Sequence, residues 1–226
     1  MNGKQAAGER AVDYIKDGMI VGLGTGSTVF YFLQALAKKV AEGLQVTGVV
    51  TSMQTAALAK ELNIPLMDLN EATTIDVCID GADEIFVADG SVYGIKGGGG
   101  ALLFEKLVAE AAQQRIWIAD ESKTVTQLGA FGLPVEVVQF GYQQLERALA
   151  KRGYNPVLRR SADETPYLTD SGNYILDLQF EPITEPLALA TELKHMTGVV
   201  EHGLFNQMTE VTIIATATGA VSVATF

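Results

Sequence analysis

The segment MIVGLGTGSTVFYFLQALAKKVAEG, residues 19–43, contains the first predicted strand and the loop and helix that follow it. Its opening run, MIVGLG, is short and apolar, which is typical of a buried strand. A helix is expected from about Thr28 to Glu42, because Gly43 is placed to end it. The same alternation continues on both sides of this segment. An amphipathic helix is predicted before it, over residues 3–17, and further strands and helices follow it. This rhythm predicts a mostly parallel sheet covered by helices on both faces.

The rhythm changes after about residue 130, where shorter strands and two helices indicate a separate unit. The expected fold class is α/β, with a parallel-sheet, Rossmann-like main domain and a smaller mixed α+β domain. We assign residues 1–130 and 207–226 to the main domain and residues 131–206 to the smaller one. The apolar run near the end of the chain is expected to return to the first sheet as a strand. PLMDL, residues 65–69, is also predicted to be a strand.

The composition is that of a globular chain and argues against several functional classes. Of 226 residues, 48% are hydrophobic and 19% charged, which allows a proper core. With 27 acidic and 16 basic residues the formal net charge is −11, so the chain is poorly suited to binding nucleic acid. No apolar run approaches the roughly 18 residues of a membrane span, and the polar start of the chain predicts a cytoplasmic location. The single Cys78 and the distant histidines His195 and His202 predict no metal site.

The loop VGLGTGST, residues 21–28, follows a predicted strand and opens a predicted helix. Backbone N–H groups and the positive end of the helix dipole favour an anion at such a place. The hydroxyl groups of Thr25, Ser27 and Thr28 can add hydrogen bonds. The loop is neither a dinucleotide fingerprint, since Ser27 replaces the third glycine, nor a P-loop. A phosphate or carbohydrate site and a plain strand–helix turn both remain open.

Acidic side chains lie at the end of a later predicted strand, IDVCI, in the stretch IDGADEIF, residues 79–86. Asp80 and Asp83 would lie at the carboxyl edge of the sheet, where ligands bind in such folds. Their carboxylates can bond sugar hydroxyls or move protons. A local Asp–Gly turn and a cation site are the alternatives.

The densest signal is IKGGGGALLFEK, residues 95–106. Four consecutive glycines are costly to order, and their gain is the close approach of several N–H groups to an oxyanion or phosphate. Lys96 can stabilise negative charge that develops during a reaction. Glu105 has apolar neighbours that would raise its pKa towards that of a useful base, although a lone glutamate on a helix is usually solvated. Lys123, just after the strand RIWIA, can bind phosphate as a point charge.

Together, VGLGTGST, DGADEI, IKGGGGA with a following Glu-Lys, and ADESK closely resemble the ribose-5-phosphate isomerase A family. LPVEVV, TDSGNYILD and GVVEHGLF resemble the second domain of that family. The resemblance implies interconversion of ribose 5-phosphate and ribulose 5-phosphate, in the non-oxidative pentose phosphate branch, through a cis-enediolate and without a metal or organic cofactor. It also suggests a homodimer or homotetramer.

The resemblance further implies roles for individual residues. Glu105 matches the catalytic base, Asp80 is a candidate for ring opening, and Lys96 would stabilise the oxyanion. The residues implied to bind substrate are Lys4, Thr25, Gly26, Ser27, Thr28, Asp80, Gly81, Ala82, Asp83, Lys96, Gly97, Gly98, Gly99 and Lys123. One departure is Phe104, which stands where the family usually has an arginine that could orient the base.

Two functions of other classes are the alternatives to this one. A sugar-phosphate sensor would bind without turnover, but such domains are usually attached to a DNA-binding segment. A CoA transferase would use a glutamate as nucleophile, which acyl-CoA and borohydride would trap.

Overall fold

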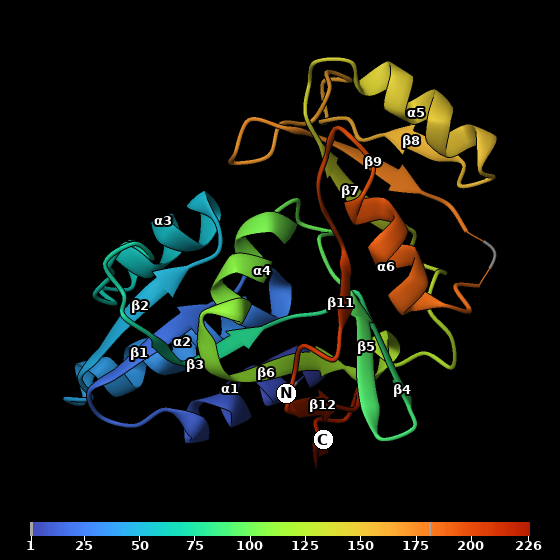
Figure 1. Ribbon diagram of the computed structural model, residues 1–226. Helices are drawn as coiled ribbons and strands as arrows, with labels where there is room; N and C mark the ends of the chain where they lie inside the picture. The colour runs from blue at the N-terminus through green and yellow to red at the C-terminus, as the bar shows by residue number, and fades with distance from the viewer. Residues whose placement is uncertain (1, 181) are drawn as a thin grey trace.

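The computed structural model describes residues 2–180 and 182–226, and it contains one large sheet and two smaller ones (Figure 1). The large sheet has the strand order β13-β12-β6-β3-β1-β2. Its strands are β1 (Met19–Leu23), β2 (Val46–Val50), β3 (Ile75–Asp80), β6 (Ala112–Asp120), β12 (Val211–Ala215) and β13 (Val221–Thr225).

Five of these six strands are parallel, and only β13 runs antiparallel to its neighbour β12. Taken in chain order, the parallel strands are arranged 2-1-3-4-5, one of the two common orders of doubly wound sheets. The direction of winding therefore reverses between β1 and β3. Ligands in such folds bind beyond the carboxyl ends of the strands at this reversal.

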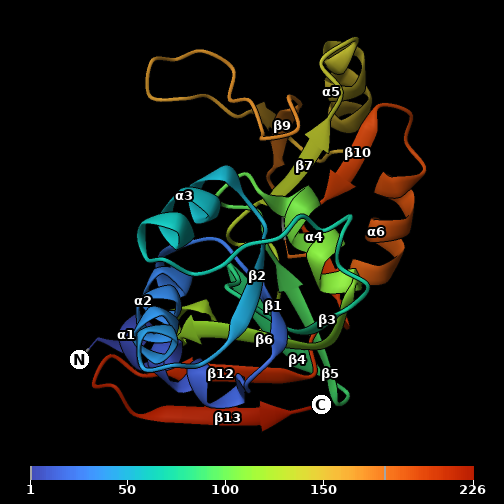
Figure 2. The same ribbon diagram turned by 90° about the vertical axis from the view of Figure 1, so that its left-hand side faces the viewer.

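Helices cover both faces of the large sheet (Figures 1 and 2). They are α1 (Gly3–Ala11), α2 (Ser27–Ala41), α3 (Met53–Glu61) and α4 (Leu102–Glu110), with short 3-10 turns η1 (Val12–Tyr14) and η2 (Glu121–Lys123). Figure 1 shows α1 and α2 below the sheet and α4 above it. The apolar run of β1 supplies Val21 and Leu23, which are fully buried together with Phe32 of α2. Each such side chain contributes about 1.5–3 kcal/mol by burial, so the strand and helix of residues 19–43 form the centre of the core.

The two smaller sheets are antiparallel. One consists of β4 (Glu84–Ala88), β5 (Ser91–Ile95) and β11 (Leu204–Asn206). The other has the order β10-β7-β9-β8 and carries two helices. Its elements are β7 (Leu133–Val137), α5 (Tyr142–Lys151), β8 (Pro156–Leu158), β9 (Tyr174–Leu178), α6 (Pro186–Lys194) and β10 (Val199–His202).

The predicted α/β class with a mostly parallel sheet is confirmed, and the end of the chain does return to the large sheet as β12. The predicted helix over residues 3–17 is shorter, since α1 ends at Ala11. The strand predicted over residues 65–69 is wrong, because a single bridge between Leu66 and Gly48 is its only pairing among the described residues. The division into domains at residues 130 and 207 stays a prediction.

The hairpin of β4 and β5 was not predicted, and it matters for the site. It turns at Asp89 and Gly90, which both have positive φ angles, of 50° and 73°. Asp-Gly between two apolar runs is the sequence signal for such a turn. Because β5 runs back along β4, it returns the chain to the carboxyl end of β3, where the Asp83 N–H donates to the Ile95 carbonyl at 2.8 Å.

Candidate active site

A small cavity of about 120 Å³ lies beyond the carboxyl ends of β1 and β3. It is lined by Lys4, Thr25, Gly26, Ser27, Thr28, Gly81, Ala82, Asp83, Lys96, Gly97, Gly98, Gly99, Glu105 and Lys123. These are the residues proposed from the sequence, with the exception of Asp80. Two larger hollows of about 620 Å³ each contain neither Lys96 nor Glu105, so the small cavity is the one in which reactive groups converge.

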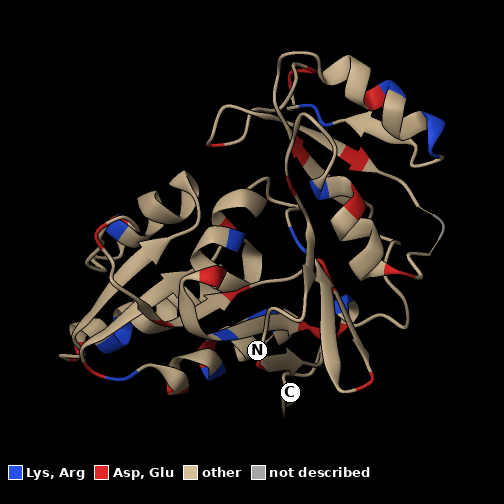
Figure 3. Ribbon diagram, in the orientation of Figure 1, with Lys and Arg blue, Asp and Glu red and all other residues tan. Residues whose placement is uncertain are grey.

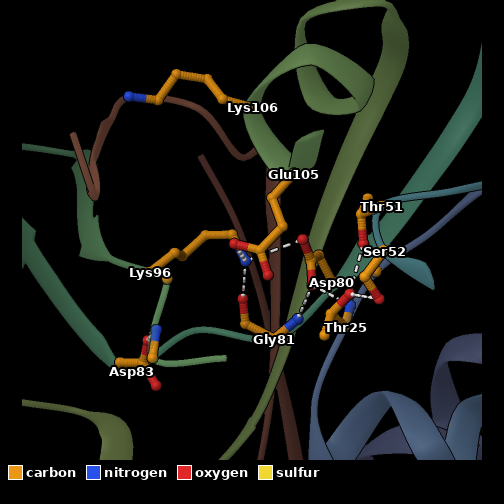
Figure 4. Close-up of polar contacts among 12 residues, drawn as sticks. Thr25, Thr51, Ser52, Asp80, Gly81, Asp83, Lys96, Glu105 and Lys106 are labelled. Atoms are coloured by element: carbon orange, nitrogen blue, oxygen red, sulfur yellow. Dashed lines mark hydrogen bonds and ion pairs between the residues drawn. The ribbon is translucent and has the colours of Figure 1, made fainter. Parts of the chain in front are cut away.

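At the base of the cavity three buried charged groups meet (Figure 4). The Lys96 Nζ lies 2.9 Å from Asp80 Oδ2 and 3.3 Å from Glu105 Oε2. It also donates a hydrogen bond of 2.7 Å to the Gly81 carbonyl. All three side chains are at most 5% exposed. Buried charges interact strongly because water does not screen them, so Lys96 and Glu105 each act on the pKa of the other, and the charge of Asp80 acts on both.

Asp80 is held rigidly and does not line the cavity. Its Oδ1 accepts hydrogen bonds from the N–H of Gly81 at 2.7 Å and of Thr25 at 3.1 Å. Gly24 makes room for this carboxylate, since a Cβ at that position would overlap the Asp80 side chain. The structure therefore places Asp80 as a fixed negative charge beneath Gly81 and beside Lys96.

Glu105 lies in the first turn of α4 and lines the cavity, with its carboxylate beside the Lys96 ammonium (Figure 4). Burial raises the pKa of its carboxyl to about 8, although the neighbouring Lys96 acts to lower it. Among the described residues its Oε2 makes no hydrogen bond, and its one charged contact is the 3.3 Å ion pair with Lys96 Nζ. Phe104 faces the hollow between α3 and α4, so Lys96 rather than a preceding arginine holds the carboxylate in place.

Lys96 is a permanent cation in this setting. Burial alone would lower its pKa, but the charges of Asp80 and Glu105 outweigh burial and raise the pKa above its ordinary value. The ring of Phe205 packs against it, with the Nζ 5.2 Å from the ring centroid. The ammonium group therefore keeps its charge while Glu105 gains or loses a proton.

The glycine loop, residues 97–100, forms another wall of the cavity with its first three residues. Gly97 has a φ of 100°, a conformation that a side chain would strain. The Asp83 Oδ2 accepts a hydrogen bond of 2.8 Å from the Gly98 N–H. Gly99 has only the Thr25 methyl group near the position of an added Cβ, at 3.6 Å, so this wall is open to a ligand.

Cations and hydroxyl groups gather at the other end of the cavity, around the beginning of α2. The Lys4 Nζ donates a hydrogen bond of 2.9 Å to the Ser27 Oγ, and Lys123 approaches from η2. Elsewhere on the ribbon Lys and Arg are interspersed with Asp and Glu (Figure 3). In a chain of net charge −11, these two lysines and the N-terminus of α2 make a local site for an anion.

The structure adds a set of hydroxyl groups that sequence reasoning missed. The Thr25 hydroxyl donates to Ser52 Oγ at 2.8 Å and lies 2.8 Å from Thr51 Oγ1 (Figure 4). Thr55 Oγ1 donates to the Gly24 carbonyl at 2.8 Å. The hydroxyl of Thr25 thus ties the first loop to α3, and its methyl group faces Gly99. The run TSMQT at the start of α3 could have indicated this cluster.

Within residues 2–180 and 182–226, no three His, Cys, Asp or Glu side chains are grouped so that they could hold a metal ion. In the same part of the chain, no helix has the length and apolar character needed to cross a membrane.

Comparisons with known proteins agree in one family. Residues 47–219 match the family model of ribose 5-phosphate isomerase A (phosphoriboisomerase A). The ribose-5-phosphate isomerase A of Lactiplantibacillus plantarum is 55% identical, over 96% of this chain and 94% of the relative, and that of Streptococcus pneumoniae serotype 4 is 50% identical, over 95% and 93%.

Solved structures give the same result. A D-ribose-5-phosphate isomerase in complex with phospho-erythronic acid superposes with a TM-score of 0.94 at 35% identity, covering all of both chains. The ribose 5-phosphate isomerase from Plasmodium falciparum superposes with a TM-score of 0.93 at 40% identity, covering 99% of this chain and 97% of the other.

Proposed function

The chain belongs to the ribose 5-phosphate isomerase A family, a family of aldose–ketose isomerases, and from this premise we propose its substrate and mechanism. It interconverts D-ribose 5-phosphate and D-ribulose 5-phosphate, and Glu105 carries the proton. The observation that supports this most is the buried Glu105 carboxylate, in contact with the Lys96 ammonium and open to the cavity. The structural relative that binds phospho-erythronic acid supports a linear sugar phosphate as ligand.

The phosphate group binds at the beginning of α2. Ser27 and Thr28 offer N–H and hydroxyl donors there, and Lys4 and Lys123 add positive charge. This anchor leaves the far end of a linear pentose at the base of the cavity. Binding energy from the phosphate thus orients the reacting carbons, although these carbons do not contact Lys4 or Lys123.

Glu105 then moves one proton between neighbouring carbons. It removes the proton from C2, the C2–H electrons form the C1=C2 double bond, and the carbonyl electrons pass to the C1 oxygen. A proton moves from the C2 oxygen to the C1 oxygen. Glu105 returns its proton to C1 as the C2 carbonyl forms, so the product is the ketose and the base is regenerated.

The charges of the site fit this sequence. When Glu105 takes up the proton, it becomes neutral and the substrate becomes an enediolate, so the net charge within the cavity does not change. Lys96 keeps its positive charge and stabilises the enediolate. A base with a pKa of about 8 also takes a weakly acidic C–H proton more readily than an ordinary glutamate does.

Asp80 and Asp83 have different roles because only one of them lines the cavity. Asp83 lines the cavity and contacts the sugar hydroxyls. Asp80 does not line it, and a direct role in ring opening would need a path past Gly81. We therefore propose that Asp80 acts on the sugar only by fixing Lys96, and that Asp83 is the better candidate for ring opening.

The test is the Glu105→Gln variant in a coupled isomerase assay, with Glu110→Gln, an exposed residue of the same helix, as the matched control. Loss of the base should lower kcat by about 10³-fold or more and change KM little. Near-wild-type turnover in Glu105→Gln would remove this residue from the mechanism. Binding of the sugar phosphate without turnover by the wild type would indicate a sensor, and a borohydride-trapped acyl adduct on Glu105 would indicate a CoA transferase.

The remaining properties implied by the family resemblance also stay proposals. They are the cytoplasmic location, the homodimeric or homotetrameric assembly, and catalysis without a metal or organic cofactor.

A further inference from the structure

The glycine loop is held from outside the large sheet, by a residue that directly follows β8. The Arg159 Nη1 donates hydrogen bonds to the Gly97 carbonyl at 2.9 Å and to the Gly98 carbonyl at 3.1 Å. The Tyr167 hydroxyl donates to the next carbonyl, that of Gly99, at 3.3 Å. Three successive carbonyl groups of the loop are thus bound from the same side.

These contacts determine where the N–H groups point. A trans peptide is planar, and its C=O and N–H point in opposite directions. The Gly98 N–H, opposite the Gly97 carbonyl, donates to Asp83, and the Gly100 N–H, opposite the Gly99 carbonyl, donates to the Gly97 carbonyl at 2.9 Å. The Gly99 N–H, opposite the Gly98 carbonyl, has no partner among the described residues. It points away from Arg159, and Gly99 lines the cavity.

Arg159 is itself held firmly. Its Nε donates to Asp177 Oδ2 at 2.8 Å and its Nη2 to Asp177 Oδ1 at 2.5 Å, which is a two-pronged pairing with a residue of β9. The two side chains are 16% and 25% exposed. Such a pair fixes the guanidinium plane, so the remaining Nη1 is directed at the loop.

The segment between β8 and β9 is also attached to the large sheet's side of the molecule. Asp170 Oδ2 accepts a hydrogen bond of 2.7 Å from the Met53 N–H at the beginning of α3. Figure 2 shows this segment extending above α3 from the four-stranded sheet. The donors of Arg159 and Tyr167 therefore come from a segment fixed at several points.

We propose that Arg159 and Tyr167 are positioning residues that orient the Gly99 N–H as a hydrogen-bond donor to the enediolate oxygens. The positive charge of Arg159 also polarises the Gly98–Gly99 peptide, which makes that N–H a stronger donor. This inference rests on the proposed function, since it names a donor for the intermediate of that reaction. An amide oriented before the reaction needs no reorganisation when charge develops.

The test compares two ligands in Arg159→Met, with Arg160→Met, an exposed neighbour, as the matched control. Phospho-erythronic acid presents a planar carboxylate in the place of the enediolate, whereas inorganic phosphate occupies only the anchor at α2. Arg159→Met should raise the Kd for phospho-erythronic acid about tenfold or more and lower kcat/KM by a similar factor. The Kd for inorganic phosphate should not change. If Arg159 only stabilised the fold, its loss would lower the fraction of active enzyme or weaken the binding of both ligands to the same extent. Either result would overturn the proposal.

Tyr167→Phe removes a single hydroxyl and serves if Arg159→Met does not fold. It should raise the Kd for phospho-erythronic acid about threefold or more and leave the Kd for inorganic phosphate unchanged. An unchanged affinity for phospho-erythronic acid in the folded variant would overturn the proposal, as would a wild type that binds this ligand no better than phosphate. A wild type inactive on ribose 5-phosphate would instead refute the proposed function, and the two binding constants would still decide the role of Arg159.

Discussion

Replacing Glu105 by glutamine should make the stability of the fold less sensitive to rising pH. Burial raises the pKa of this carboxyl to about 8 in the folded chain, from 4.5 for an ordinary glutamate. Between these values the folded chain holds a proton that the unfolded chain releases. Its contribution to stability is therefore complete below pH 4.5 and is lost as the pH rises through 8. With about 1.4 kcal/mol per pKa unit, the upper limit of this loss is roughly 5 kcal/mol.

The assay is urea unfolding of the wild type, Glu105→Gln and the control Glu110→Gln at pH 5, 7 and 9. Groups away from the site titrate equally in all three proteins, so the difference between free energies of unfolding reports on residue 105 together with its contact to Lys96. Between pH 5 and pH 9, we expect the free energy of unfolding of Glu105→Gln to rise by about 2–5 kcal/mol relative to that of the wild type. Parallel pH dependences of the wild type and Glu105→Gln would refute the assignment of a raised pKa to this buried carboxyl.

Three further predictions concern catalysis, substrate binding and stability. The kcat/KM of the wild type should rise with pH along a limb centred near the pKa of about 8 of Glu105, because the base must be ionised; a flat profile from pH 6 to pH 9 would contradict this. Ser27→Ala should raise KM for the sugar phosphate about three- to tenfold and leave kcat nearly unchanged in steady-state assays, because it removes a donor at the phosphate anchor. Glu201→Gln removes the negative charge that lies 2.7 Å from the buried Lys106 ammonium, and it should lower the free energy of unfolding, measured in urea, by about 3 kcal/mol, whereas Glu192→Gln, in an exposed pair, should lower it by less than about 1 kcal/mol. Equal losses in these two variants would show that burial of the first pair does not matter.

The convergence of the loops could be predicted from the sequence, because the carboxyl ends of parallel strands meet at one edge of a sheet. The loops after β1, β3 and β6 each begin at such an end, and the residues singled out in them line one cavity. The sequence could not show which of these side chains line the cavity and which are buried beneath its wall. Asp80 and Asp83 are three residues apart, and only the fold shows that one lies beneath the wall and the other on it.

Contacts between distant segments were also beyond the sequence. Arg159 lies 62 residues from Gly97, and nothing near it suggests a role at the glycine loop. The hairpin of β4 and β5 could have been predicted from Asp89 and Gly90. The strand expected over residues 65–69 failed because Pro65 has no N–H to donate and the segment runs beside an edge strand that offers it one bridge.

Lys106 follows Glu105 directly in the chain, and Figure 4 shows the two side chains leaving α4 in different directions. The ammonium group of Lys106 lies 2.7 Å from both Glu201 Oε1 and the His202 carbonyl, which belong to β10 in the four-stranded sheet. The helix that carries the proposed base is thus anchored to the part of the protein that the parallel strands do not form. An engineer who wished to shorten this enzyme to its parallel-sheet half, or to graft a foreign module in place of the rest, would have to rebuild that anchor first.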